Sequence, residues 1–118
     1  MSDIELAIVC DEDIIYARRQ GRDFATHAGF STSAVRLVGT AVSELARNIF
    51  LHAQRGSIRL SLINADGRSG VRIIARDEKA GTERPALGLC AIKDLFDGFE
   101  IVSSAGTGTT VTVDKWMS

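Results

Sequence analysis

The chain of 118 residues has the length of one ordinary domain, and its 45% hydrophobic content is enough for a buried core. Fourteen Lys and Arg against fifteen Asp and Glu leave a net charge of −1, which excludes the strongly basic balance typical of nucleic-acid-binding proteins. The first residues show no secretory leader pattern and no run approaches the ~20 apolar residues of a membrane span, so we expect a cytoplasmic protein without a membrane partner.

The chain begins with a pattern typical of a strand followed by a helix. Residues 4–9 form a short apolar run, as a first strand would. Apolar residues then recur at helical spacing over residues 11–30. Asp11 or Asp13 is the candidate N-cap of this helix, and Gly29 is a natural residue at its C-terminal end.

A second amphipathic helix follows the serine-rich residues 31–33, which offer new N-caps. It is expected to end near residues 54–56. The apolar residues of its buried stripe are Val35, Val38, Val42, Leu45 and Ile49.

The second half of the chain predicts four strands and one further helix. Two of the strands make a hairpin around a connection rich in turn residues, and an irregular segment with the only proline precedes the helix. In chain order the segments are strands 57–64 and 70–76, irregular residues 77–85, helix 86–98, and strands 99–104 and 109–116. This β-α-α-β-β-α-β-β order predicts an α/β protein of the α+β two-layer type, with a mixed β-sheet and three helices on one face, as one domain over residues 1–118.

Two polar residues interrupt the second helix at a spacing of one turn. Asn48 is a poor choice inside a helix because its side chain competes for backbone hydrogen bonds. Glu44 and Asn48 project from one side of the helix, next to the buried stripe. A carboxylate there can take a proton from a nucleophile, and an amide oxygen can ligate Mg²⁺. The alternative is a solvated helix edge on which Glu44 pairs with Arg47.

Three further positions are candidates for ligand binding together with Glu44 and Asn48. Asp77 ends a strand, where a carboxylate can accept a hydrogen bond from the exocyclic amine of adenine, although a loop-starting Asp is common. Gly88 opens the third helix, where backbone can approach a phosphate closely. Thr109 belongs to the "GTGTT" stretch, which reads either as a tight hairpin or as a bend beside a ligand.

The order of these pieces resembles the Bergerat-fold, or GHKL, nucleotide-binding superfamily of histidine kinases, type II topoisomerases and heat-shock chaperones. Within it, the chain is similar to the anti-sigma-regulatory serine/threonine kinases of the RsbT and RsbW type, which act in bacterial stress-response partner switches. The resemblance rests on "TAVSELARNIFLHA" (residues 40–53), "GLCAIKDLFDGFEIVS" (residues 88–103) and "GTGTTVTVDKW" (residues 106–116). It covers nearly the whole chain.

The resemblance implies ATP and Mg²⁺ as cofactors and a role for each matching residue. Glu44 would be the catalytic base and Asn48 the Mg²⁺ ligand. The ATP-binding residues would be Asp77 at adenine, Gly81 in the turn after it, Gly88 at the phosphates and Thr109 behind the base. The implied substrate is a serine on a STAS-domain antagonist or scaffold protein. A phosphatase or a sigma-regulatory protein is the other implied partner.

The segment after Asp77 departs from the family pattern. Lys79 stands at the first glycine position of the family's D-x-G-x-G adenine loop, and Ala86 stands where the glycine-rich ATP lid has a glycine. The lid between Asp77 and Gly88 is also shorter than in the family. Two hypotheses therefore stay open: an Mg-ATP-dependent kinase, and a non-catalytic binding module of the same fold with weak or no ATP binding.

Overall fold

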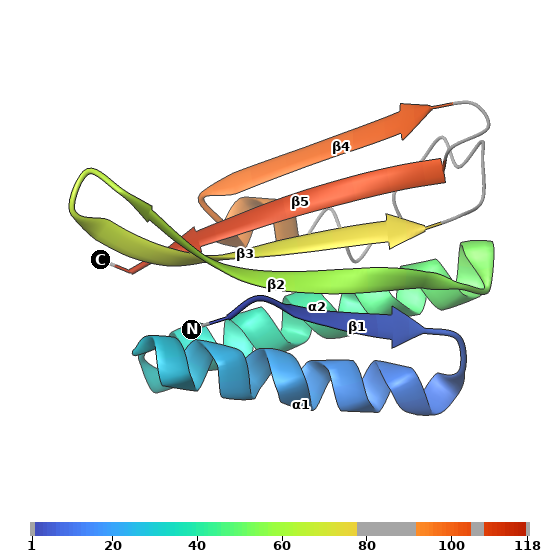
Figure 1. Ribbon diagram of the computed structural model, residues 1–118, viewed down its shortest axis with the longest axis horizontal. Coiled ribbons are helices and arrows are strands. Elements are labelled where there is room, and N and C mark those ends of the chain that lie inside the picture. The colour runs from blue at the N-terminus through green and yellow to red at the C-terminus, as the bar shows by residue number, and fades with distance from the viewer. Residues whose placement is uncertain (1, 78–91, 105–107, 118) are drawn as a thin grey trace.

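The computed structural model describes residues 2–77, 92–104 and 108–117, and within these ranges it has two layers. One layer is a five-stranded sheet of order β1-β2-β3-β5-β4, and the other is the helix pair α1 and α2 (Figure 1). The elements are β1 (Ile4–Ile8), α1 (Asp11–Ala28), α2 (Thr32–Ala53), β2 (Gly56–Ala65), β3 (Arg68–Asp77), β4 (Gly98–Ser104) and β5 (Gly108–Trp116). The predicted two-layer α+β sandwich is confirmed.

The sheet differs from the prediction in the direction of its strands. All four pairings among the described strands, β1 with β2, β2 with β3, β3 with β5 and β5 with β4, are antiparallel, so the sheet formed by these strands is not mixed. The reason is the connection between β3 and β5. The chain passes through β4 at the edge first, and β5 then pairs antiparallel with β4 and lies beside β3, running against it.

Helix α1 ends at Gly29 as predicted, but its N-cap differs from the prediction. Cys10 occupies the N-cap position and makes no side-chain capping bond, so neither predicted aspartate is the cap. Asp13 Oδ2 instead accepts a hydrogen bond from the backbone N–H of Val9 at 2.9 Å. At the other end, Gly29 has φ of 99°, and Phe30 N–H returns to the carbonyl of Ala25, as a Schellman-type end requires.

Helix α2 begins at the predicted serine cluster. Ser31 is its N-cap, and the Ser31 hydroxyl accepts a hydrogen bond from Ala34 N–H at 3.3 Å. The helix ends at Ala53, and Gln54 adopts a left-handed conformation with φ of 68°. All five residues of the predicted stripe are buried, because this side of α2 packs against the sheet and α1.

The β2–β3 hairpin is tighter than predicted. Ala65 pairs with Arg68, so the loop contains only Asp66 and Gly67. Both have positive φ, 52° and 78°, which are the signs that a type I′ turn requires. The turn matches the right-handed twist of the strands, and therefore both strands run to their full ten residues and carry Asp77 to the end of β3.

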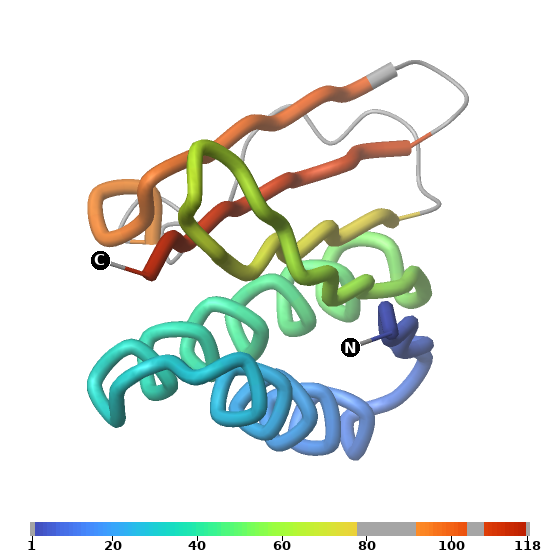
Figure 2. The backbone as a smooth tube through the Cα atoms, turned by 60° about the vertical axis from the view of Figure 1, so that its left-hand side comes forward, coloured from blue at the N-terminus to red at the C-terminus, as the bar shows by residue number. Residues whose placement is uncertain are grey.

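Alternation along the strands separates a buried face from an open one. The face toward the helices carries apolar side chains from all five strands, including Ile8, Ile58, Ile73 and Val113. The other face carries polar residues such as Arg59, as the sequence pattern predicted. Figure 1 and Figure 2 show α1 and α2 together on one side of the sheet.

Only the last part of the third expected helix is described. Residues 92–95 are helical, and Ile92 belongs to the same buried core as α1 and α2. No helix within the described ranges combines the length and the apolar character that crossing a membrane demands.

Candidate functional site

Glu44 and Asn48 lie on the same side of α2, as predicted from their spacing. Both side chains are half-buried, whereas Leu45 between them is 1% exposed. The pair therefore sits at the margin of the core instead of on the fully solvated surface of the helix. The alternative that Glu44 pairs with Arg47 finds no support, since no ion pair joins them.

The amide of Asn48 carries an unsatisfied hydrogen-bonding atom. Its Nδ2 is buried and has no hydrogen-bond partner among the residues that the structure describes. Leaving such a group unpaired costs about 1–3 kcal/mol. A half-turn of the amide exchanges Nδ2 and Oδ1 with little change of shape, so this position accepts either an acceptor ligand or a cation. An orphaned amide of this kind fits a ligand-binding residue.

Asp77 and Thr109 come together at the other side of the candidate site. The Asp77 side chain points to the helix-facing side of the sheet, and both residues are 8% exposed. The backbone N–H of Thr109 donates to Asp77 Oδ1 at 3.1 Å. This bond orients the carboxylate, and the other oxygen, Oδ2, has no hydrogen-bond partner among the residues that the structure describes.

Gly108 lets β5 approach Asp77 closely. Its φ is 92°, in the region that side chains disfavour. A β-carbon there would collide with the carbonyl oxygen of Asp77 and lie 3.2 Å from Oδ1. Gly108 is therefore required where it stands, and the hydrogen bond from Thr109 to Asp77 depends on it.

Gly56 brings α2 against the end of β3. It pairs with Asp77, and a β-carbon on Gly56 would lie 2.8 Å from the side chain of Ile49 and 3.0 Å from the Cα of Asp77. Ile49 directly follows Asn48 in α2. In Figure 1 and Figure 2 the last turns of α2, the end of β3 and the start of β5 lie at one end of the molecule. The structure thus brings Asn48 and Asp77 to the same region.

Two predicted ATP-binding residues, Gly81 and Gly88, lie outside the described residues, as does Lys79. The described site consists of Glu44, Asn48, Asp77 and Thr109. Within the described part of the chain, no three His, Cys, Asp or Glu side chains gather as a metal cage.

Sequence reasoning missed Gly56 and Ser103 as residues of this region, whereas Gly108 belongs to the "GTGTT" stretch for which it had considered a bend beside a ligand. The hydroxyls of Ser103 and Thr109 lie 2.8 Å apart across the β4–β5 pair. Strand alternation is the signal that places Ser103 on the same face as Thr109, but it becomes useful only when the pairing register is known.

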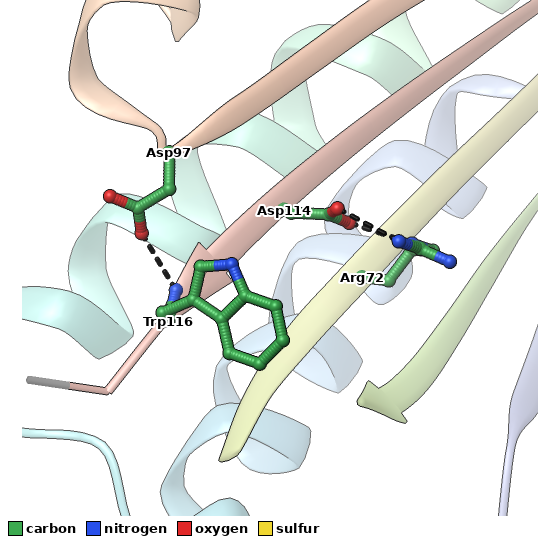
Figure 3. Close-up of polar contacts among 4 residues, drawn as sticks. All are labelled: Arg72, Asp97, Asp114 and Trp116. Atoms are coloured by element: carbon green, nitrogen blue, oxygen red, sulfur yellow. Dashed lines mark hydrogen bonds and ion pairs between the residues drawn. The ribbon is translucent and has the colours of Figure 1, made fainter. Parts of the chain in front are cut away.

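A cleft of about 540 Å³ lies at the opposite end of the sheet, and none of the predicted site residues lines it. Two of its polar residues, Asp97 and Arg68, are engaged within the fold. Asp97 accepts a hydrogen bond from the backbone N–H of Trp116 at 2.8 Å (Figure 3). The guanidinium of Arg68 stacks over the Trp116 ring at 4.9 Å. On the open face nearby, Arg72 and Asp114 form a two-bonded ion pair, which raises the pKa of Arg72 (Figure 3).

Comparison with known proteins identifies the family. The model of the histidine kinase-like ATPase domain matches residues 11–115. The chain is 36% identical over 124 aligned positions to the serine/threonine-protein kinase RsbT of Bacillus subtilis (strain 168), and the match covers 93% of each chain. The protein belongs to the histidine kinase-like ATPase family, and within it to the RsbT type, as the sequence motifs predicted.

A solved structure supports the fold independently. A chain in the crystal structure of the SiaB–SiaC complex from Pseudomonas aeruginosa matches 99% of this chain and 90% of its own length, with a TM-score of 0.61 and 12% sequence identity. At that identity the likeness concerns the fold alone.

Proposed function

We propose that the protein is an Mg-ATP-dependent protein serine/threonine kinase of a bacterial stress-response partner switch, built as one ATPase domain over residues 1–118 with a shortened lid. Its proposed substrate is a serine on a STAS-domain antagonist or scaffold protein. The similarity to RsbT over 93% of both chains supports the reaction class.

The observation that carries the nucleotide part of this proposal is the buried carboxylate of Asp77. Thr109 N–H holds its Oδ1, and Oδ2 remains as an oriented acceptor in a site that excludes most water. An ionised carboxylate accepts and does not donate hydrogen bonds, so it selects a ligand edge that carries a donor. The exocyclic amine of adenine is such a donor, and Thr109 would lie behind the base.

Glu44 and Asn48 divide the chemistry at the phosphate end. Glu44 would take the proton of the substrate serine as its oxygen forms the bond to the γ-phosphorus, while the bond to the bridging oxygen breaks and ADP leaves with the electron pair. Asn48 would hold the Mg²⁺ ion, which when bound neutralises phosphate charge. Gly81 and Gly88 are proposed to approach the nucleotide with their backbones, at adenine and at the phosphates respectively.

Two experiments test this proposal: one measures ATP binding and the other measures phosphoryl transfer. Calorimetry with ATP, in the presence and in the absence of Mg²⁺, measures nucleotide binding, and we expect Mg²⁺ to tighten it. Asn48→Ala should remove most of this Mg²⁺ dependence. Incubation with γ-labelled ATP and a panel of purified STAS-domain proteins measures transfer. Absence of ATP binding at millimolar concentration would exclude the kinase function.

The second candidate is a binding module without catalysis, and the specific observation behind it is Lys79 in place of a glycine beside a shortened lid. This candidate predicts a stable complex with a STAS-domain protein and no effect of ATP on that complex. The kinase predicts label on a serine of the partner. The two candidates therefore differ in a single gel-based transfer assay.

A further inference from the structure

Helix α2 carries an exposed stripe that runs past Glu44. Its members are Thr40, Arg47 and Leu51, which lie four residues before, three residues after and seven residues after Glu44. Residues at these spacings share one side of a helix. Leu51 is 64% exposed, so a large apolar side chain ends the stripe in the last turn of α2.

A protein that presents a serine to Glu44 has to cover part of this exposed stripe. A general base acts only within hydrogen-bond distance of the hydroxyl whose proton it takes. Glu44 is half-buried, and the core closes the side of the helix where Leu45 lies. The approach is therefore from the solvent side of α2, where Arg47 and Leu51 are exposed.

The helix pair around the stripe carries unneutralised positive charge. Residues 14–53 contain five arginines and only two acidic residues, although the whole chain has a net charge of −1. All five arginines are exposed, and none of their side chains has an ion pair or hydrogen bond within the part of the chain that the structure describes. The five are Arg18, Arg19, Arg22, Arg36 and Arg47.

The open face of the sheet differs, because arginines there have acidic partners. Arg59 pairs with Asp3 at 2.9 Å, and Arg72 pairs with Asp114 at 2.7 Å. Charge available to an acidic partner is therefore concentrated on the helix pair and not spread evenly over the molecule.

Gly39 brings one arginine of α1 close to the stripe. It directly precedes Thr40, and a β-carbon on Gly39 would lie 2.6 Å from Cγ and 2.9 Å from Cδ of Arg22. The aliphatic part of Arg22 thus packs where a side chain of α2 would otherwise be. Arg22 also lines a groove of about 470 Å³ along the outer side of α1. The positive surface is therefore continuous from α1 to the stripe.

We propose that the exposed stripe of α2, together with the neighbouring arginines, is the docking surface for the protein substrate. The matching surface of that substrate carries acidic side chains near its serine and an apolar side chain that covers Leu51. Complementary charge orients such an encounter and excludes partners of like charge, and arginine is enriched among the residues that dominate binding energy. The inference rests on the proposed kinase function and deepens it by assigning the surface and chemistry of the partner.

Exposed positions make this inference open to direct test, because their substitution creates no buried cavity. Arg47→Glu reverses one charge, whereas Arg47→Lys keeps it. Leu51→Gln removes the apolar contact and retains a good helix former. Arg76→Glu and Val102→Thr are the matched controls, since both residues are exposed on the open face of the sheet.

The probe is the purified STAS-domain protein of the panel that binds the parent. Calorimetry measures its affinity for each variant and the affinity of each variant for ATP, and the transfer assay measures KM for the same protein. We expect Arg47→Glu to weaken the complex and raise this KM at least about tenfold, and Leu51→Gln to do so about fivefold. ATP affinity should stay at the parent value.

The controls and Arg47→Lys should behave nearly as the parent does. Added salt should weaken the parent complex more than the Arg47→Glu complex, because salt screens the attraction that the variant has lost.

The outcomes separate this inference from the proposed function. Parent affinity in both Arg47→Glu and Leu51→Gln overturns the docking surface, as does an equal loss in the open-face controls or a parallel loss of ATP affinity. A complex that forms without transfer and is weakened by Arg47→Glu supports the docking surface and overturns the kinase. A panel from which no protein binds the parent overturns both.

Discussion

The polar groups at the two ends of the sheet differ in how many of their hydrogen-bonding atoms have partners within the protein. At the end with the 540 Å³ cleft, Asp97 bonds the backbone of Trp116 and Arg68 stacks on the same residue, so the polar groups serve the fold. At the other end, Asp77 is buried with one carboxylate oxygen oriented by the chain, and Asn48 has a buried nitrogen with no partner among the described residues. We therefore expect the ligand at the Asp77 end and not in the open cleft.

The difference shows that the largest polar cost and the open cleft lie at different ends, and we take the unpartnered buried groups as the guide to the site. Burying a polar group without a partner costs free energy, so a fold tolerates it mainly where a ligand supplies the partner. At the cleft end, Asp97 and the Trp116 backbone are hydrogen-bonded to each other, so neither carries this free-energy cost. Substitutions at the two ends, each with a matched control, test whether the ends differ in function as they do in chemistry.

The largest effect is expected at Glu44. Glu44→Gln removes the proton acceptor while keeping size and shape, so phosphoryl transfer should fall by about 10²- to 10⁴-fold with ATP affinity nearly unchanged. Transfer to a STAS-domain substrate and ATP calorimetry measure the two quantities. Glu100→Gln, on the open face of β4, is the matched control and should keep parent activity. Equal transfer rates in the Glu44 variant and the parent would remove Glu44 as the base.

The next effect distinguishes two glycines with similar backbone angles. Gly108 and Gly67 have φ of 92° and 78°, but only at Gly108 would a β-carbon meet other atoms. Gly108→Ala combines backbone strain with a collision against Asp77 and should cost about 2–4 kcal/mol of unfolding free energy and most of the ATP affinity. Gly67→Ala should cost about 1 kcal/mol from the positive φ alone and leave ATP affinity intact. Similar losses in both variants, measured by urea unfolding, would contradict the close approach at Gly108.

A smaller effect is expected for paired aspartate substitutions at the two ends. Asp77→Asn should weaken ATP binding about tenfold to a hundredfold, the equivalent of roughly 1.5–3 kcal/mol, because a charged acceptor is lost from a buried site. Asp97→Asn makes the same chemical change at the cleft end and should leave ATP affinity at the parent value. If both variants bind ATP as the parent does, Asp77 is not the adenine-binding residue.

The smallest effect concerns pH. The Val9 N–H bond to Asp13 lowers the pKa of that carboxyl below its usual value. A lowered pKa in the folded state means that the ionised carboxylate stabilises the fold above about pH 4, and that this contribution is lost as the pH falls through the folded-state pKa. Asp13→Asn should therefore lower the melting temperature slightly at pH 7, and the difference from the parent should shrink toward pH 3. A difference that stays constant across this range would assign the effect to something other than the charge.

The order and type of the described elements could be predicted from the sequence because they depend on local periodicity and capping. Each such feature depends on residues that are close together in the chain. Examples are the apolar stripe of α2, the N-cap of α2 at Ser31 and the C-terminal end of α1 at Gly29. The family could also be identified from the motif stretches at residues 40–53, 88–103 and 106–116, and the family model and the relative agree with it.

What only the tertiary structure decided is the pairing of segments that are distant in the sequence. The antiparallel direction of β5 beside β3 depends on the route of the chain through the edge strand, which periodicity does not encode. The contact between Ser103 and Thr109 depends on the register of β4 with β5, and a shift of β4 by one residue would turn Ser103 to the other face. The unpartnered nitrogen of Asn48 likewise becomes visible only when every neighbour in the described part of the chain has been placed.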